Sequence, residues 1–141
     1  MSECAIALPS EVNLPVRYKS QRDNENNPSG SCNVTSCAMV LDFFGKRGNG
    51  DGQFEDQLYI ECQERGLSRH DPYDLQTLMR SHGINDEFRE DAKWSDAKAH
   101  LAAGSPLICH GYFTKFGHII VIRGYVPNGW IVNDPWGEIM F

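Results

Sequence analysis

One cysteine of this chain lies where a helix is expected to begin. Cys32 follows the polar segment Ser29-Gly30-Ser31 and opens a stretch in which apolar residues recur at helical spacing. The N-terminus of a helix carries partial positive charge and free N–H groups, and both favour the thiolate form of a cysteine placed there. Because a thiolate is a nucleophile, Cys32 predicts the chemistry of a cysteine hydrolase.

The other cysteines bear on how specific this prediction is. Most free cysteines are small buried apolar residues. Cys37 fits that description, because Ala38 and Leu41 mark the packed face of the same helix. The chain has 5 cysteines, an odd number, and none of them shows Cys-x-x-Cys spacing. We therefore expect free thiols, synthesis in a reducing compartment and no structural zinc.

A thiol nucleophile needs a base beside it, and His118 is the best candidate. It follows Gly117 and opens the apolar run 119–122, so the ring is presented at the edge of a predicted strand. His110 is the main rival, but it lies in the middle of a predicted strand, where we expect a structural role. The remaining histidines are expected in or beside helices, in contact with solvent: His70, His82 and His100.

The base in turn needs an acceptor on its second ring nitrogen, and the oxyanion needs a donor. Asn133 and Asp134 end the strand that pairs with the His118 strand, and alternation allows only one of them to face it. Simple hairpin counting places Asp134 nearer to Ile122 than to His118, so a strongly twisted or bulged hairpin is required. Gln21 carries a side-chain amide that can donate to an oxyanion.

These residues must be held by helices that come first and strands that come last. We predict an edge strand over Leu14–Tyr18, a loop over Ser20–Gly30, and helices over Cys32–Phe44, from Phe54 to Gly66, from Asp71-Pro72 to Gly83 and from a Ser95 cap to Gly104. Three strands are predicted over Pro106–Phe113, His118–Val126 and Trp130–Asp134, with a turn at Asn128-Gly129. This order predicts an α+β fold in one domain over residues 1–141.

The composition and charge of the chain exclude several classes of partner and site. A net charge of −6 without a basic stripe excludes nucleic acid as the expected partner, and the apolar runs are too short for membrane insertion. Residues Met1 to Leu8 lack a basic region typical of a secretory signal, so we expect cytoplasmic synthesis. Asp23 with Asn24 and Glu25, or Asp51 with Glu55, do not match a calcium loop. We expect a monomer without a cofactor or metal.

Four motifs, in order, resemble those of the papain-fold cysteine peptidases related to the bacteriocin leader-processing (double-glycine) peptidases. They are Ser20-Gln21-Arg22-Asp23-Asn24, Cys32 to Val40, Gly117-His118 and Asn133-Asp134-Pro135-Trp136-Gly137. The resemblance covers Leu14 to Gly137 and implies a papain-like fold, with the nucleophile helix packed on a C-terminal antiparallel sheet. It implies Cys32 as nucleophile and His118 as general base. It also implies Asp134, rather than Asn133, as the orienting residue and Gln21 as the oxyanion donor.

The resemblance leaves the substrate open. We expect a thiol-dependent amide-bond hydrolase of the stand-alone type, which cleaves peptide stems of the bacterial cell wall as bacterial or phage lysins do, after release to the wall. The alternatives are a leader-peptide or protein-processing peptidase, an acyl-transferase with the same residues, and an inert peptide-binding module. The chain carries no transporter segment and ends at Phe141, where related domains continue into further sheet, which is compatible with a domain cut from a longer protein.

Overall fold

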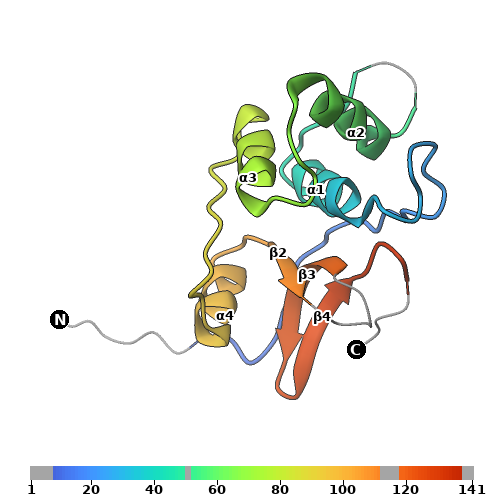
Figure 1. The fold of residues 1–141 in the computed structure, drawn as a ribbon. Coiled ribbons are helices and arrows are strands. Elements are labelled where there is room, and N and C mark those ends of the chain that lie inside the picture. The colour runs from blue at the N-terminus through green and yellow to red at the C-terminus, as the bar shows by residue number, and fades with distance from the viewer. Residues whose placement is uncertain (1–7, 50–51, 112–117, 138–141) are drawn as a thin grey trace.

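The computed structural model describes residues 8–49, 52–111 and 118–137. Its elements follow one another in the order β1 (Val12–Asn13), α1 (Cys32–Phe43), α2 (Phe54–Arg65), α3 (Pro72–Ser81), α4 (Trp94–Ala102), β2 (Leu107–Gly111), β3 (His118–Val126) and β4 (Gly129–Asn133). Helices α1 to α3 gather at one end of the molecule and the antiparallel strands at the other (Figure 1). The α+β class predicted from the sequence is confirmed.

The helix ends follow local signals. Asp71 caps α3 through its carboxylate, which accepts the Tyr73 N–H at 2.9 Å, and Pro72 occupies the first helical position. Helix α4 begins at Trp94, ahead of the Ser95 cap predicted from the sequence. The prediction of Ser95 was wrong because the carboxylate of Asp96 accepts the Lys93 N–H at 2.9 Å and fixes the start earlier.

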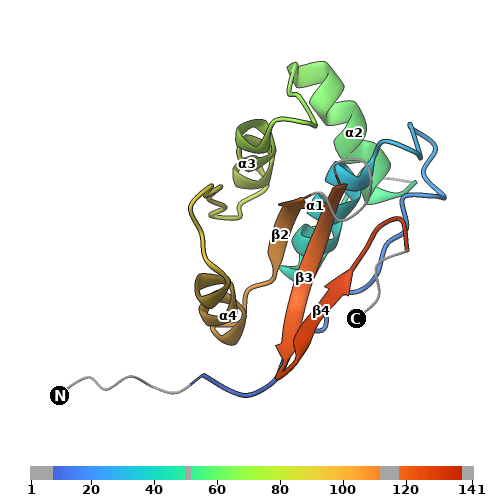
Figure 2. The same ribbon diagram turned by 60° about the horizontal axis from the view of Figure 1, so that its bottom comes forward.

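Helix α1 is buried on all sides. Alongside its apolar residues, the polar Asn33, Thr35 and Ser36 are also buried. The helix contacts α2 and α3 as well as β2 and β3, so it lies between those two helices and the sheet (Figure 2). The sequence predicted an amphipathic helix with a single packed face, which underestimates how completely α1 is enclosed. A helix enclosed in this way is a rigid support for its first residue.

The sheet is organised around β3. Strands β1 and β4 pair with the same β3 residues, Gly124 and Tyr125, so they lie on opposite sides of it. Strand β2 pairs with 118–122 on the side of β3 away from β4, because β4 also reaches Val121 and Ile122. Gly124 is required at the β1 crossing, since an added Cβ would lie 2.0 Å from the Val12 carbonyl oxygen.

A β-bulge interrupts the hairpin of β3 and β4. Ile122 pairs with Val132, whereas the next pair is Gly124 with Ile131, so Arg123 is an extra residue in β3. In this register the residue after β4, Asp134, continues toward Ile120, on the same face as His118. Without the bulge, Asp134 would lie across from Val121, on the opposite face. The bulge that hairpin counting required is therefore present.

Several further boundaries differ from the sequence predictions: α1 ends at Phe43, β2 begins at Leu107, and β4 covers Gly129–Asn133. The first strand covers Val12–Asn13 rather than Leu14–Tyr18. Leu14 still donates to the Arg123 carbonyl at 2.8 Å, but the chain then leaves the sheet edge, and Val16 is buried against the core. The hairpin turn consists of residues 127 and 128, because Gly129 already pairs with Val126. The predicted residues Tyr112 and Phe113 lie outside the described part of the chain.

Candidate active site

Cys32 is the first residue of α1 and is partly exposed. The residue before it, Ser31, makes no side-chain cap, and its hydroxyl contacts the amide of Asn24 at 2.9 Å. Among the described residues, no acceptor is found for the backbone N–H groups of Cys32 and Asn33. The thiol therefore lies at an uncapped helix N-terminus whose N–H groups are available to an anion.

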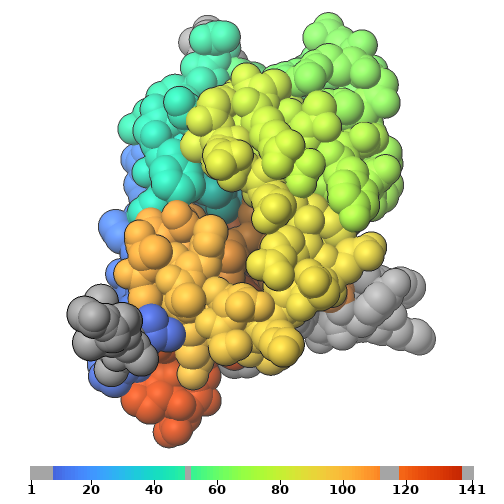
Figure 3. Space-filling view, turned by 90° about the vertical axis from the view of Figure 1, so that its left-hand side faces the viewer, coloured from blue at the N-terminus to red at the C-terminus, as the bar shows by residue number. Residues whose placement is uncertain are grey.

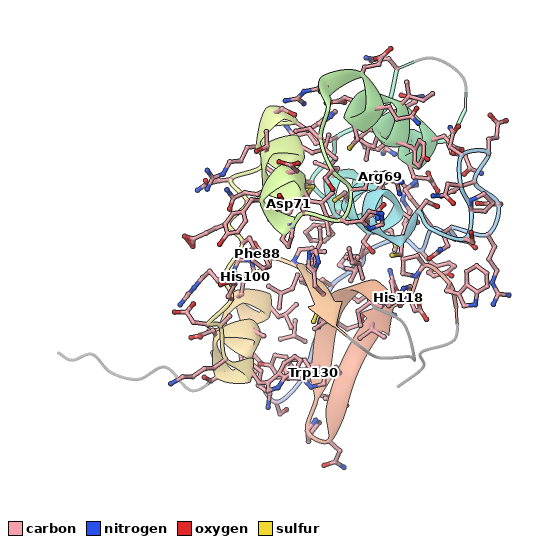
Figure 4. The ribbon with its side chains drawn as sticks, viewed as in Figure 1. Arg69, Asp71, Phe88, His100, His118 and Trp130 are labelled. Atoms are coloured by element: carbon pink, nitrogen blue, oxygen red, sulfur yellow. The ribbon has the colours of Figure 1, made fainter. Side chains whose placement is uncertain are left out.

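His118 lies between Cys32 and Asp134. Its Nε2 is 2.5 Å from Oδ1 of Asp134, which leaves Nδ1 as the ring nitrogen for the thiol. Hydrogen bonding to the Cys32 side chain, followed by that to Asp134, raises the pKa of His118 from 6.5 to about 9 against the lowering effect of burial. The imidazole is thus held as a cation at neutral pH beside the sulfur. Figure 4 shows His118 at the start of β3.

Asp134 is buried and held in place from several directions. Its Oδ1 also accepts the backbone N–H of Trp136 at 2.9 Å. These two contacts fix the position of the carboxylate, and the carboxylate in turn fixes the orientation of the imidazole. The structure brings Cys32, His118 and Asp134 together in the arrangement of a nucleophile, a base and an orienting group.

The neighbouring Asn133 points elsewhere. Its Nδ2 donates to the Val16 carbonyl at 3.0 Å, and its Oδ1 accepts from Arg123 Nε at 2.9 Å. Asn133 therefore ties β4 to the bulge and to the chain leaving β1. The choice between the two residues, which hairpin counting left open, is decided in the geometry by the bulge.

Gln21 is buried near the same segment but is not bonded to the thiol. Its backbone N–H donates to the Pro135 carbonyl at 2.9 Å, which places it beside Asp134. Its Nε2 donates to the Pro28 carbonyl at 2.9 Å and retains a second hydrogen, while its buried Oε1 has no partner within the described residues. No hydrogen bond between the side chains of Gln21 and Cys32 is present in the described part of the chain.

A buried polar residue missed by the sequence analysis supports the start of α1. Asn24 is 5% exposed, and with its side-chain amide oriented so that both ends are satisfied, Oδ1 accepts from Ser31 Oγ and Thr35 Oγ1, each at 2.9 Å. In this orientation Nδ2 donates to Gln53 Oε1 at 3.0 Å and to the Ser20 carbonyl at 3.2 Å. Asn24 therefore joins the loop that carries Gln21 to the turn that carries Cys32. One asparagine in a polar loop carries no sequence signal for such a role.

The rival residues are occupied elsewhere. His110 packs edge-on against Phe88, with ring centroids 5.7 Å apart, and burial lowers its pKa. Cys37 is fully buried, and burial raises the pKa of its thiol, as it does for Cys62 and Cys109. A raised pKa keeps these thiols protonated and unreactive at neutral pH.

A shallow pocket of about 430 Å³ lies beside the candidate site. It is lined by Arg22, Pro28, Ser29 and Trp136, and the Arg22 guanidinium lies 4.3 Å from the centre of the Trp136 ring. Both residues adjoin candidate site residues in the chain, since Arg22 follows Gln21 and Trp136 comes soon after Asp134. The pocket therefore lies close to the segments that carry Gln21 and Asp134.

No group of three or more potential metal ligands is found within residues 8–49, 52–111 and 118–137. The loop that carries Asp23, Asn24 and Glu25 is bonded to α2, where the Asp56 carboxylate accepts the backbone N–H groups of Glu25 and Asn26 at 3.2 and 3.1 Å. Asp51 lies outside the described residues.

Within residues 8–49, 52–111 and 118–137, each helix is too short or too polar to span a lipid bilayer.

Comparison with known proteins identifies the family of this chain. The model of the Peptidase_C39 like family matches residues 13–140, which is most of the chain. No curated protein and no solved structure gives a match. The match covers all four candidate site residues, namely Gln21, Cys32, His118 and Asp134. The chain belongs to the Peptidase_C39-like family of papain-fold cysteine peptidases.

Proposed function

We propose that this protein is a thiol-dependent peptidase in which Cys32 is the nucleophile, His118 the general base and acid, and Asp134 the orienting residue. The observation that carries the proposal is the placement of His118 between a helix-terminal thiol and a buried carboxylate, with its pKa raised to about 9. The family match supports the same class of chemistry.

The reaction follows from this arrangement. In the resting pair the proton of Cys32 is already carried on Nδ1 of His118, and the thiolate attacks the scissile carbonyl carbon. When the tetrahedral intermediate collapses, the C–N bond breaks and His118 gives its proton to the leaving amine. A water molecule, deprotonated by His118, then attacks the thioester and releases the acid and the free thiol. Asp134 keeps its charge throughout and stabilises the imidazolium.

The developing oxyanion needs donors, and the site offers two sources. The backbone N–H of Cys32 points out of an uncapped helix end, where the helix dipole adds favourable potential. The second hydrogen on Nε2 of Gln21 is the proposed side-chain donor. Removing a donor of this kind typically costs about 10²–10³ in turnover.

We further propose that the substrate is the peptide stem of bacterial cell wall. Such stems carry free carboxylates, and Arg22 places positive charge in the pocket beside the site. Trp136 provides an aromatic wall in the same pocket. Leader processing is the second candidate, since the motifs of the chain resemble those of the double-glycine peptidases. An acyl-transferase would use the same residues with an amine in place of water.

The test is incubation of the protein with purified cell wall and, separately, with a double-glycine leader peptide, followed by mass spectrometry of the products. We expect stem fragments that are absent when Cys32→Ala is used. Cleavage of the leader peptide alone would assign the protein to processing instead. Binding of either substrate without any product would identify an inert binding module.

A further inference from the structure

A second hollow, which we call the linker groove, lies away from the candidate site. It has a volume of about 1080 Å³ and is enclosed by β2, α4, the 84–93 linker and the C-terminal end of α1. Figure 3 shows this face, hollowed between α4 in orange and the linker in yellow. Val40, which lines the groove, is about 12 Å along the helix axis from Cys32 at a rise of 1.5 Å per residue. None of the candidate site residues lines the groove.

The floor of the linker groove is the edge of a strand. Leu107, Ile108, Cys109 and His110 all line it, although successive side chains of a strand point to opposite faces. Because residues from both faces of β2 line the groove, the groove meets this strand at its edge. Strand β2 pairs with β3 on one side, and within the described residues no strand or linker backbone pairs with its other side.

An open strand edge is a template for another chain. It presents a row of backbone N–H and C=O groups, which an extended peptide satisfies by adding a strand. All residues of β2 are only half-buried, so the edge is accessible. A peptide backbone carries N–H and C=O groups at the same spacing as the strand edge. A saccharide has no such regular row of alternating donors and acceptors.

The walls indicate which side chains such a peptide carries. Phe88 and Trp94 line the groove, and Trp94 is 58% exposed, which suits apolar contacts. Four carboxylate residues line the groove, against three cationic residues, of which Arg89 pairs with Asp91 at 3.4 Å. The half-buried Asp86 carboxylate accepts no hydrogen bond from any described residue, and burial raises its pKa despite the opposing effect of Arg80 and His100. These features complement a basic side chain.

We propose that the linker groove binds an extended polypeptide segment with alternating apolar and basic side chains, which adds a strand to the free edge of β2. The apolar side chains contact Phe88 and Trp94, and a basic side chain pairs with Asp86. This binding site does not depend on the chemistry of Cys32, so it is tested separately from the proposed peptidase activity.

The probe is a fluorescein-labelled octapeptide of alternating lysine and valine, titrated against the full chain carrying Cys32→Ser. We expect saturable binding, together with slower amide hydrogen exchange over Leu107–Gly111. The same octapeptide with alternate backbone nitrogens methylated loses strand hydrogen bonds and should bind at least about tenfold more weakly. Equal binding of the methylated peptide, or no change in exchange over β2, would overturn the proposal.

Matched variants locate the charge contact. Asp86→Asn keeps the shape of the side chain and should weaken binding about fivefold, whereas Glu64→Gln on the exposed side of α2 should not change it. An equal effect of both variants would indicate attraction by net charge alone and contradict the site. Chitotetraose is titrated in parallel, and its binding in place of the peptide, with a shift in tryptophan fluorescence lost in Trp94→Ala, would assign the groove to glycans instead.

Discussion

Cys32 and Cys37 lie on the same helix but in opposite environments. Cys32 occupies the uncapped first turn, is partly exposed and contacts His118. Cys37 is fully buried among the helices and sheet, where burial raises the pKa of its thiol. The difference between them arises from position along one helix, since both are chemically the same thiol. In the proposed function, the neighbours of Cys32 and its access to solvent make this thiol, and not Cys37, the nucleophile.

The largest difference between the two cysteines is expected when each one is replaced by alanine. Cys32→Ala removes the nucleophile and should lower peptidase turnover by at least about 10⁴-fold, with the fold unchanged. Cys37→Ala leaves a small cavity and should reduce the free energy of unfolding by about 1–2 kcal/mol, while turnover changes less than about threefold. Product formation and urea unfolding measure the two effects. Loss of activity in Cys37→Ala with intact folding would reverse the assignment.

The next largest effect is expected at the orienting carboxylate. Asp134→Asn keeps the shape but can no longer hold the imidazolium, so kcat/KM should fall by about 10²–10⁴-fold. Asn133→Ala serves as the matched control, since Asn133 bonds to Val16 and Arg123 and should affect stability instead. Steady-state kinetics on both variants checks this. Comparable losses of kcat/KM from the two substitutions would contradict the role of the bulge.

The pH dependence sharpens the role of His118. Its folded pKa is raised from 6.5 to about 9, so the stabilisation from its charged form is fully present below 6.5 and is lost as the pH rises through about 9. Because the bond to Asp134 raises this pKa, Asp134→Asn should move the loss to lower pH. Thermal unfolding from pH 6 to 10 measures this pH dependence for the native protein and for Asp134→Asn. Identical pH profiles for the two proteins would show that Asp134 does not act on the imidazole.

A smaller effect is expected from the support behind the first turn. Asn24→Ala removes the contacts to Ser31 and Thr35 and should lower kcat about tenfold with little change in KM. Asn24→Ser, which retains a polar group, should recover part of the loss. The split between kcat and KM distinguishes positioning from substrate binding. An unchanged kcat in Asn24→Ala would show that the turn holds its geometry without this residue.

The sequence predicted the class of fold and the helices well, because capping residues and glycines mark their ends. Gly45 and Gly66, with φ of 82° and 68°, follow α1 and α2 as expected. The candidate site could also be proposed from the sequence, through Cys32 and His118, and the resemblance added Asp134. The bulge at Arg123 was only recognised as a requirement, since its position depends on how β1 and β4 pair with β3.

Features built from tertiary contacts were not predicted. The role of Asn24 depends on two hydroxyls that come near it only when the loop folds onto α1. The short length of β1 depends on the burial of Val16, which draws the chain away from the sheet edge. The linker groove depends on the free side of β2, which no local pattern in the sequence marks.

The most direct test of the central claim is the rate of alkylation at each cysteine. The protein is exposed to a limiting amount of iodoacetamide at pH 7 and digested, and each site is quantified by mass spectrometry. We predict that Cys32 is alkylated first and that His118→Gln slows only this site, because the imidazolium that stabilises its thiolate is lost. Faster alkylation of Cys37 or Cys109 in the native protein would contradict the assignment of the nucleophile.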